Sequence, residues 1–328
     1  MDKSDKAREY VEKYITLGIE HNMGYSKRYI ATVLYSENPD IYANVEDARW
    51  FIRNVLNANG KVRPKNIDLA ARFALIPNGV DEVAWNPFTM PKGYTKSLVI
   101  ADLHSRFMDK GAFETAINYG IKKKCDSVII DGDFMDFYGS SHFDKDPSII
   151  KYFEDEREWG QDTLKLLQDC FGYVVLKKGN HDIRREKKIQ QLAIQHEEIR
   201  GLETYADYLR YDRSNVQIVE DYNYIKYGKL YIFHGHEYQG GGGKHVAFNR
   251  LNKAMKHILS AHSHVSTDYK MKTIDQDVLI SCTVGCLCNL HPRYNPLNNW
   301  SQGFAIVERE EDGTFEINNK VIINKIIY

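Results

Sequence analysis

Residues 127–136, SVIIDGDFMD, constrain the fold of this chain more than any other stretch. An apolar, β-branched run ends in Asp131, and Gly132 then lets the backbone turn before Asp133 and Asp136. In an open α/β sheet, ligands bind at the carboxyl ends of the strands, so acids placed there are suited to chemistry rather than to packing. The stretch therefore predicts a buried strand whose end carries functional carboxylates.

Strand patterns and helix patterns alternate between residues 96 and 199. Such alternation predicts a parallel sheet that is covered by helices. After about Val216 most segments read as strands, with one helix expected over 244–255, and they predict a second, largely antiparallel sheet packed on the first. The alternating elements are strands at 97–101, 127–131 and 173–176, and helices at 110–124, 149–170 and 183–199.

The first 95 residues have a different character. Residues 1–65 carry apolar residues at helical spacing, and we interpret them as a small all-helical domain similar to helix-turn-helix modules. Turn signals over 66–95 predict a linker that packs on the α/β domain, which we place at 96–328. Residues 1–65 hold eleven Lys and Arg against nine Asp and Glu. Nucleic-acid binding and a plain cap or oligomerisation role therefore both stay open.

Composition and hydropathy limit the cellular setting. The formal net charge of −1 gives no overall attraction to nucleic acid or to an anionic membrane. No apolar run approaches the ~20 residues that cross a bilayer, and the charged N-terminus lacks the apolar core of a signal peptide. We expect a soluble, cytoplasmic protein with reduced cysteines and no membrane partner. The sequence carries no signal for the oligomeric state.

Three cysteines and a histidine cluster near the end of the predicted strand region. Cys282, Cys286, Cys288 and His291 follow the spacing C-x3-C-x-C-x2-H, which matches no common structural zinc pattern. Because they lie in or just after an apolar run, we interpret the cysteines as small buried thiols.

Carboxylate, imidazole and amide side chains recur at the ends of the predicted strands. Oxygen and nitrogen ligands in this mixture suit divalent Mn, Fe, Zn or Co. Each group alone has an ordinary explanation as a turn or a surface residue, but their common placement at strand ends predicts a metal site. The five groups are Asp102 with His104, Asp133 with Asp136, Asn180 to Asp182, His234, and His262 with His264.

Together these groups resemble the five-motif signature of the calcineurin-like metallophosphoesterase superfamily, over roughly residues 96 to 310. The resemblance implies a four-layer α/β/β/α sandwich that holds two divalent metal ions. Mn is the first choice of metal, and Fe, Zn, Co or Ni are alternatives. It also implies a hydrolase in which a metal-bridging hydroxide attacks a phosphoester. The matching segments are Asp102-Leu103-His104, Gly132-Asp133-Phe134-Met135-Asp136, Gly179-Asn180-His181-Asp182, His234 and His262-Ser263-His264.

The resemblance further implies a role for each residue. Asp133 would bridge the two metals, and its negative charge would relieve their mutual repulsion. His181 would contact the phosphate and protonate the leaving oxygen, while Asp136 orients and stabilises its imidazolium. One metal would be held by Asp102, His104 and His264, and the other by Asn180, His234 and His262.

The chain departs from the family pattern at several positions. Ala261 stands where the last motif usually has Gly, and Asp182 stands where the third often has Glu. Phe137 occupies the position at which the protein Ser/Thr phosphatase branch carries a phosphate-clamping Arg, which argues against a phosphoprotein substrate. Arg184 and His142 are candidate substrate-binding residues, and each is also explained as an ordinary solvated side chain.

The favoured function is therefore phosphodiester hydrolysis, with DNA or RNA as the candidate substrate and the N-terminal helices helping to hold it. A phosphomonoesterase acting on a protein or a nucleotide is the first alternative. A non-catalytic nucleic-acid or protein binding module on the same scaffold is the second.

Overall fold

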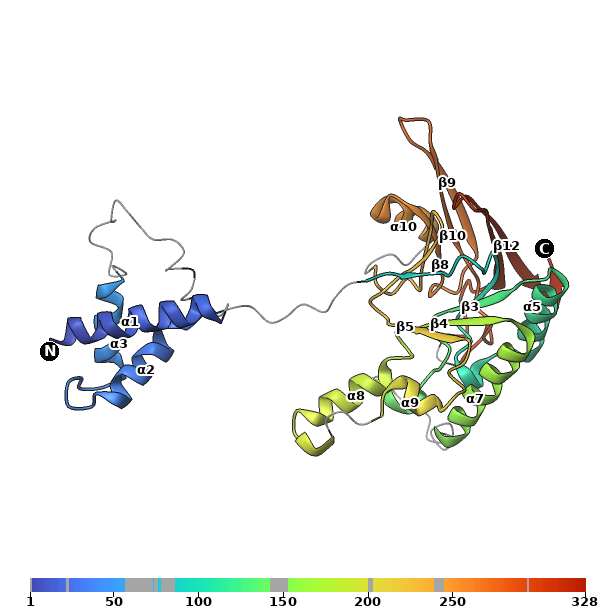
Figure 1. Ribbon diagram of the computed structural model, residues 1–328. Helices are drawn as coiled ribbons and strands as arrows, with labels where there is room; N and C mark the ends of the chain where they lie inside the picture. The colour runs from blue at the N-terminus through green and yellow to red at the C-terminus, as the bar shows by residue number, and fades with distance from the viewer. Residues whose placement is uncertain are drawn as a thin grey trace. The chain divides into compact units, whose positions relative to one another are not determined.

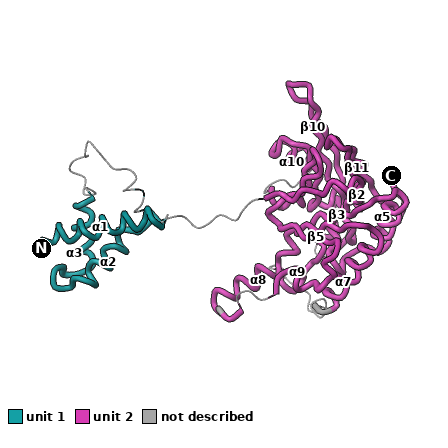
Figure 2. The backbone as a smooth tube through the Cα atoms, viewed as in Figure 1, with its two compact units in different colours: residues 1–84 teal, residues 85–328 magenta. Residues whose placement is uncertain are grey.

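The computed structural model describes residues 2–21, 24–56, 73, 76–77, 86–141, 153–199, 203–238, 245–293 and 295–328. The chain divides into two compact units, residues 1–84 and residues 85–328 (Figure 2). Helices in the described part of the chain all lack the combination of length and hydrophobicity that a bilayer crossing requires.

The first unit is built from three described helices, α1 (Lys3–Glu20), α2 (Lys27–Glu37) and α3 (Val45–Val55). Side-chain oxygens of Ser26 and Asn44 accept backbone N–H groups in the first turns of α2 and α3. Such caps satisfy donors that have no partner within the helix. The helices share an apolar core formed by Ala7, Tyr10, Val11, Tyr14, Ile30, Ala31, Leu34, Tyr42, Ala48, Ile52 and Leu56.

The second unit contains two sheets among its described residues. The larger one has the strand order β13-β12-β11-β2-β3-β4-β5. Strands β2 to β4 are parallel, as predicted, and β5 continues them in the parallel sense, whereas β11 pairs with β2 in the antiparallel sense. The strands are β2 (Lys96–Ile100), β3 (Ser127–Asp131), β4 (Tyr173–Lys177), β5 (Val216–Val219), β11 (Gln302–Arg309), β12 (Phe315–Ile323) and β13 (Ile326–Ile327).

Strand β3 lies between β2 and β4, and all five of its residues are buried. Val128 and Ile130 pack into the core beneath the helices, whereas Ile129 packs into the core between the two sheets. Because both faces of the strand are covered, an unbroken apolar run is needed rather than an alternating one. The acids that follow the run are buried as well, since Asp131 is 0% exposed, Asp133 1% and Asp136 5%.

The second sheet has the strand order β1-β6-β7-β8-β10-β9. The expectation of a largely antiparallel sheet is wrong, because β1 with β6, β7 with β8, and β8 with β10 are parallel pairs. Helix α10 (Val246–Ala254) supplies the crossover that a parallel β7–β8 pair requires. The strands are β1 (Phe88–Thr89), β6 (Ile225–Tyr227), β7 (Leu230–Phe233), β8 (His257–Ser260), β9 (Thr267–Lys272) and β10 (Val278–Thr283).

Four layers result, and Figure 1 shows helices on the outer face of each sheet. Helices α5 (Lys110–Lys122) and α7 (Phe153–Cys170) cover the seven-stranded sheet, while α10 covers the six-stranded one. The predicted α/β/β/α sandwich is thereby confirmed. The remaining described helical segments are η1 (Ser105–Phe107), η2 (Tyr138–Ser140), α8 (Arg184–Ala193), η3 (Glu197–Ile199) and α9 (Tyr205–Leu209).

Two predicted boundaries differ from the structure. Helix α8 ends at Ala193 rather than at residue 199, and a short 3-10 turn, η3, replaces its last part. Strands β5, β11 and β12 were expected in the second sheet but belong to the first one, where β5 lies beside β4 and β11 pairs with β2 and β12. Their apolar patterns cannot distinguish the two sheets, because both sheets offer a buried face.

Candidate metal centre

The predicted ligands follow the carboxyl ends of β2, β3, β4, β7 and β8, which meet at one edge of the two-sheet sandwich. Several of the turns that carry them are in the left-handed backbone region, which costs non-glycine residues of order 1–3 kcal/mol each. Strain of this kind persists only where the surrounding contacts enforce it. The ligands with positive φ are Asp102 (52°), His104 (53°), Asp133 (51°), His262 (66°) and His264 (57°).

One group of ligand atoms gathers around Asp102. The Nε2 atoms of His104 and His264 lie 3.2 Å apart, and His264 Nε2 lies 3.2 Å from Asp102 Oδ1. His104 Nε2 is 3.9 Å from the same oxygen. All three side chains are buried. The structure therefore brings together the three residues that the resemblance assigns to one metal.

A second group gathers around Asp133. Its Oδ2 lies 3.2 Å from His234 Nε2 and 3.9 Å from His104 Nε2, so this carboxylate faces both groups. His262 also offers a ring nitrogen, and this atom, a ring nitrogen of His234 and a carboxylate oxygen of Asp133 all lie within 4.8 Å of one another. The backbone N–H of His262 donates to Asp102 Oδ2 at 3.0 Å, which ties the two groups together.

The unsatisfied atoms of the site test whether metal ions fit. Among the described residues, Asp102 Oδ1, Asn180 Oδ1 and His234 Nε2 are buried and have no hydrogen-bond partner. A buried polar atom without a partner is costly, and a cation would satisfy all three. Carboxylate, amide and imidazole donors are also the set that divalent transition metals accept. The residues fit the dinuclear divalent centre that the resemblance implies.

Electrostatics point in the same direction. Burial lowers the pKa of His234, but the carboxylates of Asp133 and Asp102 outweigh it and raise that pKa to about 10. His264 behaves alike, with burial opposed by Asp102 and a pKa raised to about 10. The buried carboxylates thus favour positive charge in the site. In the absence of a metal cation, protons on His234 and His264 provide that charge.

The second ring nitrogen of three predicted ligand histidines, His234, His104 and His264, is held by a neighbouring group. His234 Nδ1 donates to the backbone oxygen of Asp131 at 2.6 Å, and His104 Nδ1 donates to Asp136 Oδ1 at 3.1 Å. The thiol of Cys288 lies 3.8 Å from His264 Nδ1. Such contacts fix the tautomer that leaves Nε2 free for a metal. Cys288, one of the three clustered cysteines, therefore lies beside the site, which the cysteine spacing alone did not reveal.

His181 and Asp136, predicted to act together as an acid pair, are hydrogen-bonded to each other. His181 Nδ1 donates to Asp136 Oδ1 at 2.7 Å, and the same oxygen accepts from His104, so one carboxylate orients both imidazoles. The two histidines lower the pKa of Asp136 although burial opposes them. Arg184 Nη2 donates to His181 Nε2 at 2.8 Å, and Nη1 donates to the Asp136 backbone oxygen at 3.0 Å.

Phe137 is fully buried in the core between the seven-stranded sheet and its helices. Its ring packs 5.2 Å from that of Tyr208, and its own φ is 48°. The carboxylate of Glu156, from α7, accepts the N–H groups of Asp136 (3.0 Å) and Phe137 (2.7 Å). Glu156 therefore holds the strained turn that aims Asp136. Nothing in the sequence marks it, because a glutamate within a helix usually faces solvent.

The third motif is tied to the second through Asp182. Its carboxylate accepts from the N–H groups of Gly179 (2.7 Å) and Met135 (2.8 Å), and from the hydroxyl of Tyr205 (2.6 Å). Burial raises the pKa of Asp182 to about 6. Asp182, which is shorter than the Glu often found at this position, thus accepts these three hydrogen bonds and fixes the second and third motifs relative to each other.

Two other residues complete the surroundings. Trp300 packs edge-on against His264, with ring centroids 4.1 Å apart. His142, the other candidate substrate-binding residue, lies outside the described residues.

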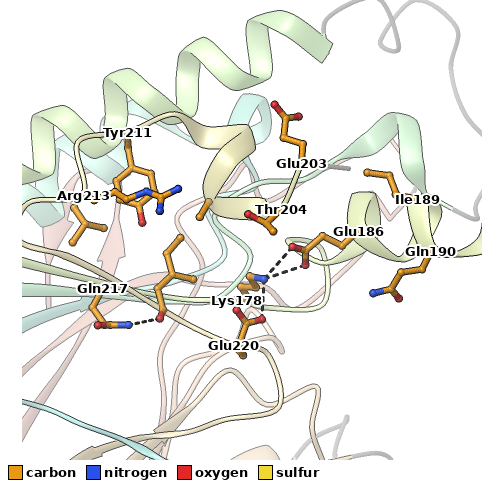
Figure 3. A pocket seen from close by; sticks show the side chains of 13 residues that line it. Lys178, Glu186, Ile189, Gln190, Glu203, Thr204, Tyr211, Arg213, Gln217 and Glu220 are labelled. Atoms are coloured by element: carbon orange, nitrogen blue, oxygen red, sulfur yellow. Dashed lines mark hydrogen bonds and ion pairs between the residues drawn. The ribbon is translucent and has the colours of Figure 1, made fainter. Parts of the chain in front are cut away.

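A groove of about 610 Å³ lies away from the ligands, between α8, α9 and the edge strand β5 (Figure 3). Among the described residues that line it, none is a predicted ligand. Lys178 Nζ pairs there with Glu186 (3.0 Å) and Glu220 (2.8 Å). Because Lys178 precedes the third motif and Glu186 lies in α8, this cluster fixes the start of the helix from which Arg184 reaches His181.

The fold and the site define a metal-dependent phosphoesterase. The sequence model described as calcineurin-like phosphoesterase matches residues 95–281, more than half of the chain. The chain belongs to this family, and it is a hydrolase that acts on phosphoester bonds.

Individual proteins resemble the chain more remotely. It is 26% identical over 228 residues to the Gene 54 protein of Mycobacterium phage L5, an alignment that covers 64% of this chain and 87% of that protein. A single mutant of Vps29 from Entamoeba histolytica is similar in structure, with 12% identity, a TM-score of 0.40, and coverage of 71% and 96%. A dimetal phosphatase from Danio rerio has 11% identity, a TM-score of 0.35, and coverage of 69% and 96%. Neither structural likeness bears on the substrate of this chain.

Proposed function

We propose that this protein is a phosphodiesterase whose substrate is nucleic acid. The observation that carries the proposal is the pairing of Arg184 with His181, while Phe137 is buried. A phosphomonoester is mostly a dianion at neutral pH, because its second pKa is about 6, whereas a diester carries one negative charge. Arg184 offers a guanidinium to the site, and position 137 adds no second one. A single positive charge suits the singly charged diester better than the doubly charged monoester.

In this proposal the seven ligands divide as the resemblance implies, and Asp133 is shared. Bound divalent cations would polarise the phosphoryl group and make a water molecule a stronger nucleophile at neutral pH. Mn²⁺ is the cation that we propose, with Fe, Zn, Co or Ni as alternatives. One site is proposed to consist of Asp102, His104 and His264, and the other of Asn180, His234 and His262.

His181 is the proposed general acid. In the described state its Nε2 accepts a hydrogen bond from Arg184, so the imidazole is neutral and carries its proton on Nδ1. We propose that an arriving phosphate draws the guanidinium of Arg184 onto its own oxygens. Nε2 is then free to take up a proton from solvent water, which gives an imidazolium that Asp136 stabilises, and to pass that proton to the leaving oxygen.

Model esters test the substrate class. We expect Mn²⁺-loaded protein to hydrolyse bis-p-nitrophenyl phosphate with a kcat/KM at least about tenfold above that for p-nitrophenyl phosphate. Labelled single-stranded DNA and RNA should then be cleaved, and the same preparation with excess EDTA gives the background. Faster hydrolysis of the monoester would overturn the diester proposal and favour a phosphomonoesterase.

We also propose that the first unit helps to hold nucleic acid. Helix α3 buries Ala48 and Ile52, while Trp50 is 55% exposed on the same helix as the cations Arg49 and Arg53. Exposed aromatic and cationic side chains together suit bases and phosphates. Residues 38–44, between α2 and α3, exceed the three- to four-residue turn of a helix-turn-helix. The binding that we propose therefore does not depend on a helix-turn-helix.

Binding by the full chain tests this second proposal. Fluorescence anisotropy with a labelled oligonucleotide should show affinity that falls as salt rises, because phosphate contacts release counterions. We expect a triple variant, Arg49→Ala with Trp50→Ala and Arg53→Ala, to lose affinity and to show a shallower salt slope. Unchanged binding would assign a different role to the first unit.

A cytoplasmic location of the protein is also part of the proposal.

A further inference from the structure

Arg250, on helix α10, is a buried cation outside the proposed chemistry. Its side chain is 2% exposed, and it passes from the outer helix layer toward the ends of β7 and β8. Nη1 donates to Ser260 Oγ at 2.5 Å and to the backbone oxygen of Ala261 at 2.8 Å. Ala261 immediately precedes the ligand His262. The guanidinium thus fixes the backbone at the point where the loop with the last two ligand histidines begins.

The same guanidinium also fixes the other ligand turn. Gly235 follows His234, has a φ of 116°, and has no room for a Cβ because Nη1 and Nη2 of Arg250 occupy that space. The N–H of Ala261 donates to the backbone oxygen of His234 at 2.9 Å, so the two turns are directly connected. Arg250 lies across this connection and contacts both sides of it.

A buried ion pair supports the turn from behind. Glu237 Oε2 accepts the N–H of Gly235 at 2.6 Å, and its Oε1 lies 2.8 Å from Lys177 Nζ. Lys177 and Asp131 are both fully buried. Asp131, whose backbone oxygen accepts from His234, keeps a carboxylate without a hydrogen-bond partner among the described residues. These acids offset the charge that Arg250 brings into the interior.

Burial of a guanidinium is expensive, and an apolar side chain of similar size would fill the same space between α10 and β8. Arg250 differs from such a side chain because its planar donors can hold two backbone segments in a fixed relation. The two segments that it holds carry His234 and His262, which are proposed ligands of the same metal.

We propose that Arg250 is a positioning residue that sets the spacing of His234 and His262, so that the second metal ion is bound. The inference rests on the proposed division of the ligands into two sites. The hydrogen bonds of Arg250 in the described part of the chain go to Ser260 and Ala261 and not to Asp102, His104 or His264, so the first metal ion is expected to bind without it. Loss of Arg250 therefore converts a two-metal centre into a one-metal centre.

Mn²⁺ binding to the full chain tests the proposal without any substrate. Equilibrium dialysis counts the bound ions, and electron paramagnetic resonance separates a coupled pair from an isolated ion. We expect the wild type to bind two ions as a coupled pair. Arg250→Met should keep the first affinity and weaken the second about 10–100-fold, the range seen when a group that orients a metal ligand is lost. Arg250→Lys keeps the charge but has a single donor nitrogen, so its affinity for the second ion should lie between those of the wild type and of Arg250→Met.

Two further variants keep the result interpretable. Lys253→Met removes an exposed cation from the same helix and should bind both ions as the wild type does. Gly235→Ala keeps the arginine but displaces its guanidinium, so it should reproduce the loss of the second ion even if Arg250→Met does not fold. Two tightly bound ions in both Arg250→Met and Gly235→Ala would overturn the proposal, as would equal weakening of both ions. A wild type that binds two ions but cleaves no diester would refute the proposed function and leave this inference intact.

Discussion

Replacement of Asp136 by Asn removes one negative charge that orients two imidazoles at once. Oδ1 of this carboxylate accepts from His181 at 2.7 Å and from His104 at 3.1 Å. Asn keeps the shape and one carbonyl oxygen, so the change removes charge and leaves the packing nearly intact. His181 is the proposed acid and His104 a proposed metal ligand, so the variant should affect two separable steps.

The magnitude follows from the two hydrogen bonds. A bond to a charged group contributes about 1.5–3 kcal/mol and a neutral one about 0.5–1.5 kcal/mol, so each imidazole loses about 1.3 kcal/mol. Since about 1.4 kcal/mol corresponds to a factor of ten, each effect is about tenfold. We expect about tenfold weaker Mn²⁺ binding through His104, and a further fall of about tenfold in kcat through His181.

The two effects separate in a metal titration of diester hydrolysis. Excess Mn²⁺ should restore the part that depends on His104, and the tenfold fall in kcat should remain for substrates whose leaving group needs a proton. Esters with a p-nitrophenolate leaving group need little protonation and should show a smaller fall. Asp126→Asn is a matched control, because Asp126 accepts N–H groups at the opposite end of β3. An unchanged kcat at saturating metal for a poor leaving group would refute the role of Asp136.

Three further predictions concern the same region. Gly132→Ala should destabilise the fold by about 2–5 kcal/mol in denaturant unfolding, because φ is 83° and the new Cβ would overlap the His234 ring; wild-type stability would contradict this. Met255→Gly should stabilise the protein by about 0.5–1 kcal/mol, since Met255 is 53% exposed and ends α10 with a φ of 50°; a loss of stability would contradict it. Mn²⁺ binding should release protons and weaken as pH falls, because in the metal-free site burial is outweighed by carboxylates that raise the pKa values of His234 and His264 to about 10. Calorimetry in buffers of different ionisation enthalpy measures that release, and its absence would contradict the charge balance.

The sequence predicts the parallel strands and the edge at which ligands gather, because strand β3 needs apolar residues on both faces and ends where its acids begin. The structure brings Asp102, His104 and His264 together, and it sets Asp133 between them and His234. Parallel strands make this possible to foresee, since their carboxyl ends share one edge of the sheet.

Other features depend on contacts between segments that no local pattern links. Glu156 holds the turn after β3 from a helix that follows it, and Arg250 reaches two ligand turns from the opposite outer layer. A glutamate or an arginine in an amphipathic helix has the same local sequence signal whether it faces solvent or the core. The predicted sheet is wrong for β5, β11 and β12 for a related reason, because either sheet could bury their apolar side chains.

The central claim is that two divalent ions, joined by Asp133, hydrolyse a phosphodiester at this sheet edge. Its most direct test compares Mn²⁺ content and bis-p-nitrophenyl phosphate hydrolysis in the wild type and in Asp133→Asn, purified in parallel. We predict two ions per chain and metal-dependent hydrolysis in the wild type, and loss of at least one ion with a fall of about 100-fold or more in rate in the variant. Equal rates in the two proteins, or a wild type that binds no Mn²⁺, would contradict the account.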